Sequence, residues 1–443
     1  LGVPYKFRPL FWVLRSIMNS PKASPTLVIN EKVNAMWAAE QDVLHLGFGE
    51  SRFPVHPILS ASLIENVSRR SYLPAIGTAS LRSVVSNFYS EKLNLNFSQE
   101  QVLVGVGSKS LLFAMVHSIE GDILLPKPSW VSYSSIAKLT GKKIIRFDLD
   151  RKNDFALNID YLESAYTTAC HKGSSPKILI LNSPNNPIGI CFSPEMIESA
   201  ALWARDKNLF ILSDEIYSLV IYKGFTHQSP AHFYPEKTII FGGLSKHLSL
   251  GGWRVGISIL PNNKEGKQLV RSFQSIAGSI WSCVPAPIQA TAELAFSGNS
   301  DIDHYIQTCT EIHRIRTTFV HQALSSMGLT SPKPTGAFYL YPSFKKWANK
   351  LEKMGINSCN DLSLHLLDQF GIATLPGSVF GDDTNNLCLR LSTSFLDMET
   401  DNQAQDVLDR FDYGINPGLF MSDHHPRTKT FLNRMGEFLY MLN

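Results

Sequence analysis

Short apolar runs alternate with longer helical stretches through the middle of the chain. The runs rich in Val, Ile and Leu are 101–107, 121–126, 142–149, 176–184, 209–215, 237–243 and 255–261. Such alternation predicts an α/β fold, with a mainly parallel sheet of the seven-stranded type and helices on both faces. The continuous apolar run KILIL at 177–181 is typical of a strand that is covered on both sides.

The pattern changes towards both ends of the chain and predicts a division into domains. We expect a large domain at 71–309 and a smaller α+β domain formed by 25–70 and 310–413. Residues 1–24 then form an N-terminal arm, and 414–443 form a C-terminal tail that ends in an amphipathic pattern. The arm is basic and aromatic, which fits either packing on a partner subunit or a targeting role.

Composition and charge exclude several classes of protein. The 443 residues carry 41 Lys and Arg against 38 Asp and Glu, a net charge of +3 that does not indicate nucleic-acid binding. With 44% apolar residues the chain can bury a sizeable core, and no apolar run approaches the roughly 20 residues that a membrane span needs. Six cysteines without a C-x-x-C pair argue against a zinc site or a disulfide framework. We therefore expect a cytoplasmic protein without a metal.

The block FGGLSKHLSLGGWRVG at 241–256 carries the most informative chemistry. Lys246 follows Ser245 directly and precedes Arg254 by eight residues. Lysine amines form Schiff bases with carbonyl cofactors and can then act as bases. The hydroxyl of Ser245 and the guanidinium of Arg254 suit a phosphate group. Taken alone, the block also fits a solvated lysine in a glycine-rich turn.

Further polar residues lie where two predicted strands end. Asp214 and Tyr217 stand in ILSDEIY, and Asn186 stands in ILILNSPNNPIG. Catalytic groups favour the carboxyl edge of α/β sheets. In combination with Lys246 and Arg254, these motifs resemble the class I and II aminotransferases, which are fold-type I enzymes dependent on pyridoxal 5′-phosphate. The resemblance runs from about residue 43 to 395.

The resemblance implies a role for each of these residues. Lys246 would form the Schiff base with the cofactor and then shuttle a proton between the substrate Cα and the C4′ carbon of the cofactor. Asp214 would pair with the pyridine nitrogen and keep it protonated. Tyr217 and Asn186 would hydrogen-bond the phenolic oxygen of the cofactor. Glu215 would point to the opposite face of an extended segment, so we expect it to be structural.

Two upstream motifs match the cofactor site of the same family. In VLVGVGSKS (102–110) the order G-K-[ST] of a nucleotide loop is missing, but the resemblance places Gly107, Ser108 and Lys109 at a helix start that binds the cofactor phosphate. In PKPSWVSY, Trp130 would stack on the pyridine ring, and Tyr133 would support Asp214.

Three more residues complete the site that the resemblance implies. Tyr72 matches a tyrosine that reaches the cofactor phosphate of the neighbouring subunit, which implies a homodimer with shared active sites. Arg390, in LCLRLSTS, matches the arginine that binds the substrate α-carboxylate. Gly49 would let the backbone approach the substrate, and Asn186 would also contact it.

The motifs leave the reaction and the donor partly open. The stretch 275–287 lacks the basic residue of dicarboxylate-specific relatives, and Phe48 and Trp281 are aromatic. We therefore expect a donor amino acid with an apolar, aromatic or thioether side chain and a 2-oxo acid as acceptor. A C–S lyase, decarboxylase or cyclase on the same fold is the alternative. A regulatory binding module fits less well because no basic helix-turn-helix pattern precedes the matched region. An inactive relative fits less well because the chemical residues are present.

The chain also departs from the family pattern at two positions. Gly243 stands where a Ser or Thr often precedes the anchoring Ser245, so one phosphate hydroxyl is absent. Arg52, in GESRF, stands where the family usually has an acid.

Overall fold

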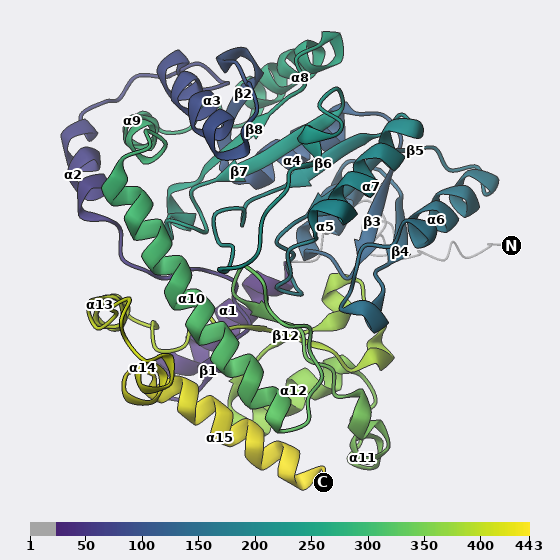
Figure 1. Ribbon diagram of the computed structural model, residues 1–443, viewed down its shortest axis with the longest axis vertical. Helices are drawn as coiled ribbons and strands as arrows, with labels where there is room; N and C mark the ends of the chain where they lie inside the picture. The colour runs from purple at the N-terminus through teal and green to yellow at the C-terminus, as the bar shows by residue number, and fades with distance from the viewer. Residues whose placement is uncertain (1–23) are drawn as a thin grey trace, which may run out of the picture.

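A seven-stranded sheet forms the centre of the protein, as seen in the computed structural model, which describes residues 24–443 (Figure 1). The strand order is β2-β8-β7-β6-β5-β3-β4, and all pairs are parallel except those of β8, which is antiparallel to both neighbours. The strands are β2 (Val102–Val106), β3 (Asp122–Lys127), β4 (Ile144–Asp148), β5 (Pro176–Asn182), β6 (Phe210–Asp214), β7 (Thr238–Gly243) and β8 (Val255–Ile259). Each apolar run singled out in the sequence coincides with one of them, although β3 extends one residue beyond its run, so the predicted α/β fold is confirmed.

Helices cover both faces of this sheet, because successive residues of a strand point to opposite faces and each face packs into its own hydrophobic core. Ile178 and Ile180 of β5 pack with helices on one face, whereas Leu179 and Leu181 pack with helices on the other. The first layer comprises α4 (Gly107–Ser118), α5 (Val131–Leu139) and α8 (Lys264–Ile280). The second comprises α3 (Ala79–Leu93), α6 (Ile159–His171), α7 (Pro194–Asp206) and α9 (Ala286–Ala295). This burial on both sides explains the continuous apolar strands.

A second region lies beside the sheet and contains two small sheets. One has the order β11-β12-β9, and the other pairs β1 with β10 in parallel. Long helix α10 (Ser300–Ser326) runs from the first region into the second (Figure 1). The remaining elements are α1 (Pro25–Ala38), β1 (Leu44–His45), β9 (Tyr339–Leu340), α11 (Ala348–Lys353), α12 (Cys359–Phe370), β10 (Ile372–Ala373), β11 (Leu375–Pro376) and β12 (Leu389–Ser392).

Several contacts cross the domain boundaries that the sequence pattern suggests. Helix α2 (Pro57–Asn66) packs on α9, a helix of the large sheet. At the other end, α13 (Asp401–Asp409), α14 (Pro417–His424) and α15 (Pro426–Met441) follow one another. Phe431, Met435 and Phe438 of α15 are fully buried and share one core with Leu44 and Leu340. Residues 414–443 are therefore part of the packed structure, while residues 1–23 of the predicted arm lie outside the described residues.

Among residues 24–443, no helix is long and apolar enough to cross a membrane. Likewise, no three His, Cys, Asp or Glu side chains in this part of the chain are grouped so that they could hold a metal ion.

Candidate active site

A cavity of about 440 Å³ opens where the ends of β5 and β6 meet the loop after β7, the start of α4 and strands of the smaller region. Eleven of the site residues expected from the sequence line it: Gly49, Ser108, Lys109, Trp130, Asn186, Asp214, Tyr217, Ser245, Lys246, Arg254 and Arg390. Gly107 lies just behind, where a side chain would collide with the guanidinium of Arg254. The structure thus brings together residues that are up to 341 positions apart in the sequence, from Gly49 to Arg390.

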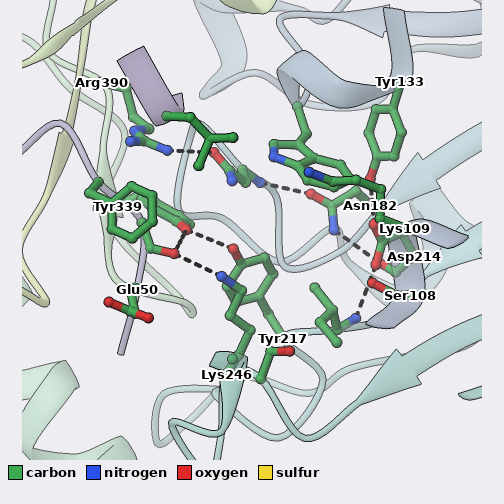
Figure 2. Close-up of a pocket in the computed structure, with 18 of the residues that line it drawn as sticks. Glu50, Ser108, Lys109, Tyr133, Asn182, Asp214, Tyr217, Lys246, Tyr339 and Arg390 are labelled. Carbon is green, nitrogen blue, oxygen red and sulfur yellow. Dashed lines mark hydrogen bonds between the residues drawn. The ribbon is translucent and has the colours of Figure 1, made fainter. Parts of the chain in front are cut away.

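Lys246 projects into this cavity from the loop that follows β7. Its Nζ donates a hydrogen bond of 2.7 Å to the carbonyl of Gly49 and lies 5.5 Å from the centre of the Tyr217 ring (Figure 2). Burial lowers the pKa of Lys246 to about 8, although the carboxylate of Glu50 opposes this shift. A substantial fraction of the amine is therefore neutral, and nucleophilic, near physiological pH.

Asp214 ends β6 and is held by donors around its buried carboxylate. The hydroxyl of Tyr133 donates to Oδ2 at 2.7 Å, as expected from the sequence, and the amide of Ile216 donates to Oδ1 at 3.3 Å. Burial raises the pKa of Asp214 to about 6, while the Tyr133 hydrogen bond acts in the opposite direction. This carboxylate is placed to pair with a cationic ring nitrogen. The next residue, Glu215, is buried away from the cavity lining, in agreement with its expected structural role.

Two sets of polar contacts connect further residues that line the cavity. The hydroxyls of Tyr217 and Tyr339 lie 2.6 Å apart. Asn182 Oδ1 accepts a hydrogen bond of 2.8 Å from the amide of Asn186, and Asn182 Nδ2 donates to the carbonyl of Asp214 at 2.9 Å. Burial raises the pKa of Tyr217 well above its usual value, with Tyr339 adding to the shift. Figure 2 shows Tyr217, Tyr339 and Lys246 facing one another.

Arg390 extends from β12 and is 1% exposed. Its Nη1 donates to Asn186 Oδ1 at 3.4 Å and its Nη2 to the carbonyl of Gly47 at 2.5 Å. The guanidinium lies 5.0 Å from the ring centre of Tyr339, and its buried Nε has no hydrogen-bond partner among the described residues. A buried guanidinium with an unmet donor and no carboxylate beside it suits a small carboxylate ligand.

The start of α4 forms a cradle for an anion. The first amides of a helix lack acceptors within the helix and carry the positive end of its dipole. Side chains are excluded next to them, because a Cβ on Gly256 would collide with the backbone of Gly107 and Ser108. Arg254 and Ser245 line the same cavity, and the Arg254 guanidinium lies against Gly107 at the start of α4. Together with a buried acid and a partly buried lysine, this donor set fits pyridoxal 5′-phosphate, which combines a phosphate, a ring nitrogen and an aldehyde.

Several residues that line the cavity were not expected from the sequence. Glu50, Asn182 and Tyr339 all contribute polar atoms, and Leu27 of α1 reaches the cavity as well. Tyr339 stands in a two-residue strand, which gives too short a pattern to single out. Glu50 follows Gly49 directly and was the one most open to discovery from the sequence.

Two expected site residues lie outside the cavity of this chain. Tyr72 is 90% exposed and does not line it. Trp281 does not line it either, but packs against Phe273 with 5.9 Å between ring centres. Phe48, by contrast, is part of the lining.

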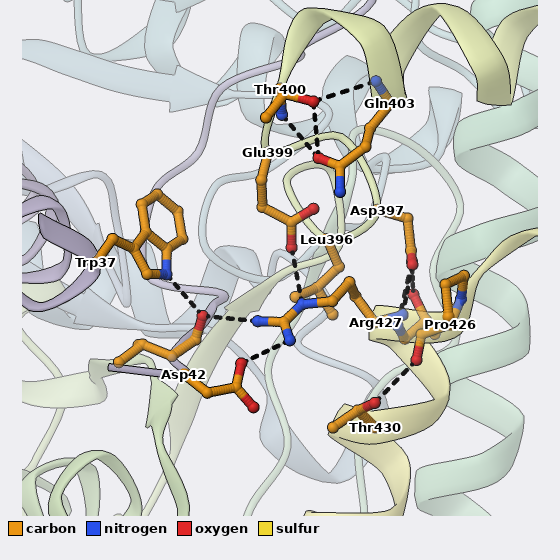
Figure 3. A network of polar contacts seen from close by, with 12 residues as sticks. Trp37, Asp42, Leu396, Asp397, Glu399, Thr400, Gln403, Pro426, Arg427 and Thr430 are labelled. Atoms are coloured by element: carbon orange, nitrogen blue, oxygen red, sulfur yellow. Dashed lines mark hydrogen bonds and ion pairs between the residues drawn. The ribbon is translucent and has the colours of Figure 1, made fainter. Parts of the chain in front are cut away.

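The segment that carries Gly49 is anchored where it begins by the C-terminal helix α15. Arg427 pairs with Asp42 at 2.6 Å and with Glu399 at 3.5 Å, and it also donates to the carbonyl of Val43 (Figure 3). Trp37 donates to that same carbonyl at 2.9 Å. These contacts fix the backbone immediately before β1, from which the chain continues to Gly49.

The fold and the cavity together define an aminotransferase dependent on pyridoxal 5′-phosphate. Residues 41–408 match the family described as aminotransferase class I and II, and the chain belongs to that family.

Individual relatives agree with this assignment. The chain is 30% identical over 370 residues to an aspartate aminotransferase of Bacillus subtilis, covering 82% of this chain and 90% of that one. It is 31% identical over 388 residues to a bifunctional aspartate aminotransferase and glutamate/aspartate-prephenate aminotransferase of Petunia hybrida, covering 85% and 78%. The fold matches aspartate aminotransferase from Thermus thermophilus with maleate at a TM-score of 0.77 and 24% identity, covering 91% and 99%. It also matches an aromatic aminotransferase from Pyrococcus horikoshii at 0.75 and 23%, covering 93% and 98%.

Proposed function

We propose that this aminotransferase moves the amino group of an amino acid with an apolar, aromatic or thioether side chain to a 2-oxo acid. Amino transfer is supported most directly by the presence of Lys246, Asp214 and Arg390 in one cavity. The apolar donor is supported by Leu27 and Phe48, which line the same cavity.

The residues of the cavity have different roles in the reaction. Pyridoxal 5′-phosphate, when bound, supplies an electron sink that allows the Cα–H bond of an amino acid to ionise. Arg390 holds the α-carboxylate through its planar fork and so orients the Cα atom. Lys246 Nζ, whose lowered pKa of about 8 leaves a fraction of it neutral near physiological pH, accepts the proton from Cα. It would then deliver this proton to the cofactor side of the substrate nitrogen, which completes amino transfer. Asp214 keeps a positive charge on the ring nitrogen, and Tyr133 holds Asp214 in place.

A second candidate donor is a dicarboxylic amino acid. Lys109 lines the cavity, with its Nζ 5.3 Å from the ring centre of Trp130, and no described residue forms an ion pair with it. A cation without a counter-ion in a substrate cavity suits a second carboxylate. The names of the relatives, which include aspartate aminotransferases, point in the same direction.

Donor specificity is tested by mixing the holoenzyme with phenylalanine, leucine, methionine, aspartate and glutamate, with 2-oxoglutarate as acceptor. The proposal predicts faster conversion of the first three. Faster turnover of aspartate that is lost in Lys109→Met establishes the second candidate instead. Release of ammonia without amination of the acceptor contradicts amino transfer and supports a lyase, and release of carbon dioxide supports a decarboxylase.

We further propose a homodimer in which Tyr72 serves the neighbouring active site. Ile64 is 72% and Val67 is 70% exposed, and both precede the exposed Tyr72 by a few residues, which suits a surface that a second subunit covers. Mixing Tyr72→Phe with Lys246→Ala subunits tests this arrangement, because a shared site predicts that the hybrid regains activity at one of its two sites. Cytoplasmic location stays a prediction.

A further inference from the structure

Three polar residues from distant parts of the sequence form one hydrogen-bonded network. The hydroxyls of Ser51 and Ser249 lie 2.7 Å apart, and the Ser51 hydroxyl lies 3.1 Å from Nε2 of His313. Ser51 and His313 are each 2% exposed. None of the three lines the active-site cavity, so any part that they play in the reaction must act through other residues. We refer to them as the Ser249–Ser51–His313 network.

His313 anchors this network to helix α10, which runs through both regions of the fold. Its ring centre lies 4.9 Å from that of Phe53 and 4.7 Å from that of Phe338. Burial, with the charge of Arg316 adding to it, lowers the pKa of His313 well below its ordinary value, so the imidazole is neutral. Its buried Nδ1 has no hydrogen-bond partner among the described residues. Within this part of the chain, the ring is therefore fixed by aromatic packing and by its hydrogen bond with Ser51.

Ser249 contributes its hydroxyl from a strained backbone conformation. It lies three residues after Lys246, in the loop between β7 and β8, and its φ is 59°. That is the left-handed region, which glycine adopts much more readily than serine. Strained residues that their surroundings hold in place are concentrated at functional sites. Glycine would suit this backbone better, but it would lack the hydroxyl that meets Ser51.

The segment that carries Gly49 and the loop that carries Lys246 are joined at two points. The first is the hydrogen bond of 2.7 Å from Lys246 Nζ to the carbonyl of Gly49, and the second is the contact between Ser249 and Ser51. Nζ changes its partners whenever it acts as a nucleophile or a base, so the first contact cannot hold the two segments together throughout the reaction. The two serine hydroxyls do not line the cavity and can keep their contact at every stage.

We propose that the Ser249–Ser51–His313 network positions Lys246 for proton transfer. Its members hold the Lys246 loop against the segment of Gly49 and so keep Nζ directed at the substrate Cα. Displacing a reacting group by about 1 Å can slow a reaction about 100-fold, which makes such an anchor effective from outside the cavity. This role rests on the proposed amino transfer and extends it to three positioning residues that do not touch the substrate.

Ser249→Gly tests the proposal most directly, because it removes the hydroxyl and suits the left-handed backbone. We expect kcat to fall about tenfold. The KM for the amino donor should change little, since Arg390 extends from β12 rather than from this loop. With a donor that carries deuterium on Cα, the isotope effect on kcat should increase, because proton transfer becomes a slower step. The urea midpoint of unfolding should stay close to that of the wild type.

Two further measurements separate positioning from a general effect on the fold. Covalent uptake of pyridoxal 5′-phosphate by the apoenzyme should also slow in Ser249→Gly, a readout that needs no amino donor. Asn208→Gly is the matched control, since Asn208 is exposed, has φ at 55° and does not line the cavity. It should leave kcat, the isotope effect and cofactor uptake unchanged.

Ser51→Ala removes the other hydroxyl and tests the same contact if Ser249→Gly fails to fold. The two single variants should have similar effects, and the double variant should be little slower than either, because both break one network. Wild-type kcat and isotope effect in both single variants would overturn the proposal, as would a loss of kcat that follows a loss of stability.

Every comparison uses the donor that the wild type converts fastest, so a wrong donor class leaves this test intact. Absence of transfer from every donor contradicts the proposed function itself. Cofactor uptake then tests the network, and equal uptake by the wild type and both single variants would overturn it.

Discussion

Replacing Tyr133 by Phe removes a hydroxyl that contacts Asp214, the buried acid of the cavity. The hydroxyl donates to Asp214 at 2.7 Å, and both residues are buried. A hydrogen bond to a charged group contributes about 1.5–3 kcal/mol net, which corresponds to about one to two pKa units. The pKa of Asp214, already about 6, should therefore rise to around neutrality or above. The ionised form, which pairs with the ring nitrogen, is then depleted at pH 7.

The assay is titration of the apoenzyme with pyridoxal 5′-phosphate across a range of pH. We expect Tyr133→Phe to bind about tenfold or more weakly at pH 7, with the deficit shrinking as the pH rises past the new pKa of Asp214. Tyr222→Phe is the matched control, since it also loses a buried hydroxyl, one that donates to the carbonyl of Ala337 at 2.8 Å and does not touch Asp214. Equal cofactor affinity of Tyr133→Phe and the wild type at every pH would refute the reasoning.

Three further predictions follow from burial and charge. The pKa of Lys246 is lowered from 10.5 to about 8, so the rate of covalent cofactor uptake by the apoenzyme should rise as the pH passes about 8. Stopped-flow absorbance measures this rate, and a midpoint of its pH dependence above 10 would contradict the lowered pKa. Arg390→Lys loses the planar fork, so steady-state kinetics should show KM for the amino donor raised about tenfold or more with the cofactor spectrum unchanged. Phe438→Ala should lower the free energy of unfolding by about 3–5 kcal/mol in urea, whereas Tyr440→Ala, 81% exposed on the same helix, should change it little.

The sequence predicted the large sheet, and the shared position of Asn186 and Asp214, for one physical reason. Most of the other expected cavity residues came from the family resemblance. Strands buried on both faces need continuous apolar runs, and polar residues directly after such runs lie at one edge of a parallel sheet. The alternation of side chains along a strand also separated Asp214 from Glu215 correctly, since the first lines the cavity and the second is buried behind it.

Other features depend on packing between segments that are distant in the sequence. Tyr339 reaches the hydroxyl of Tyr217 only because β9 pairs with β12, and a two-residue strand leaves no periodic pattern. The amphipathic pattern of α15 predicts a helix, but it does not show against which hydrophobic core this helix packs. Trp281, expected near the substrate, packs on Phe273.

Borohydride reduction of the holoenzyme tests the central claim, that Lys246 is the covalent anchor and the proton carrier of an aminotransferase. Peptide mapping should find the cofactor attached to Lys246, and Lys246→Ala should show neither the attachment nor turnover. Attachment to a different lysine, or turnover retained in Lys246→Ala, would contradict the account.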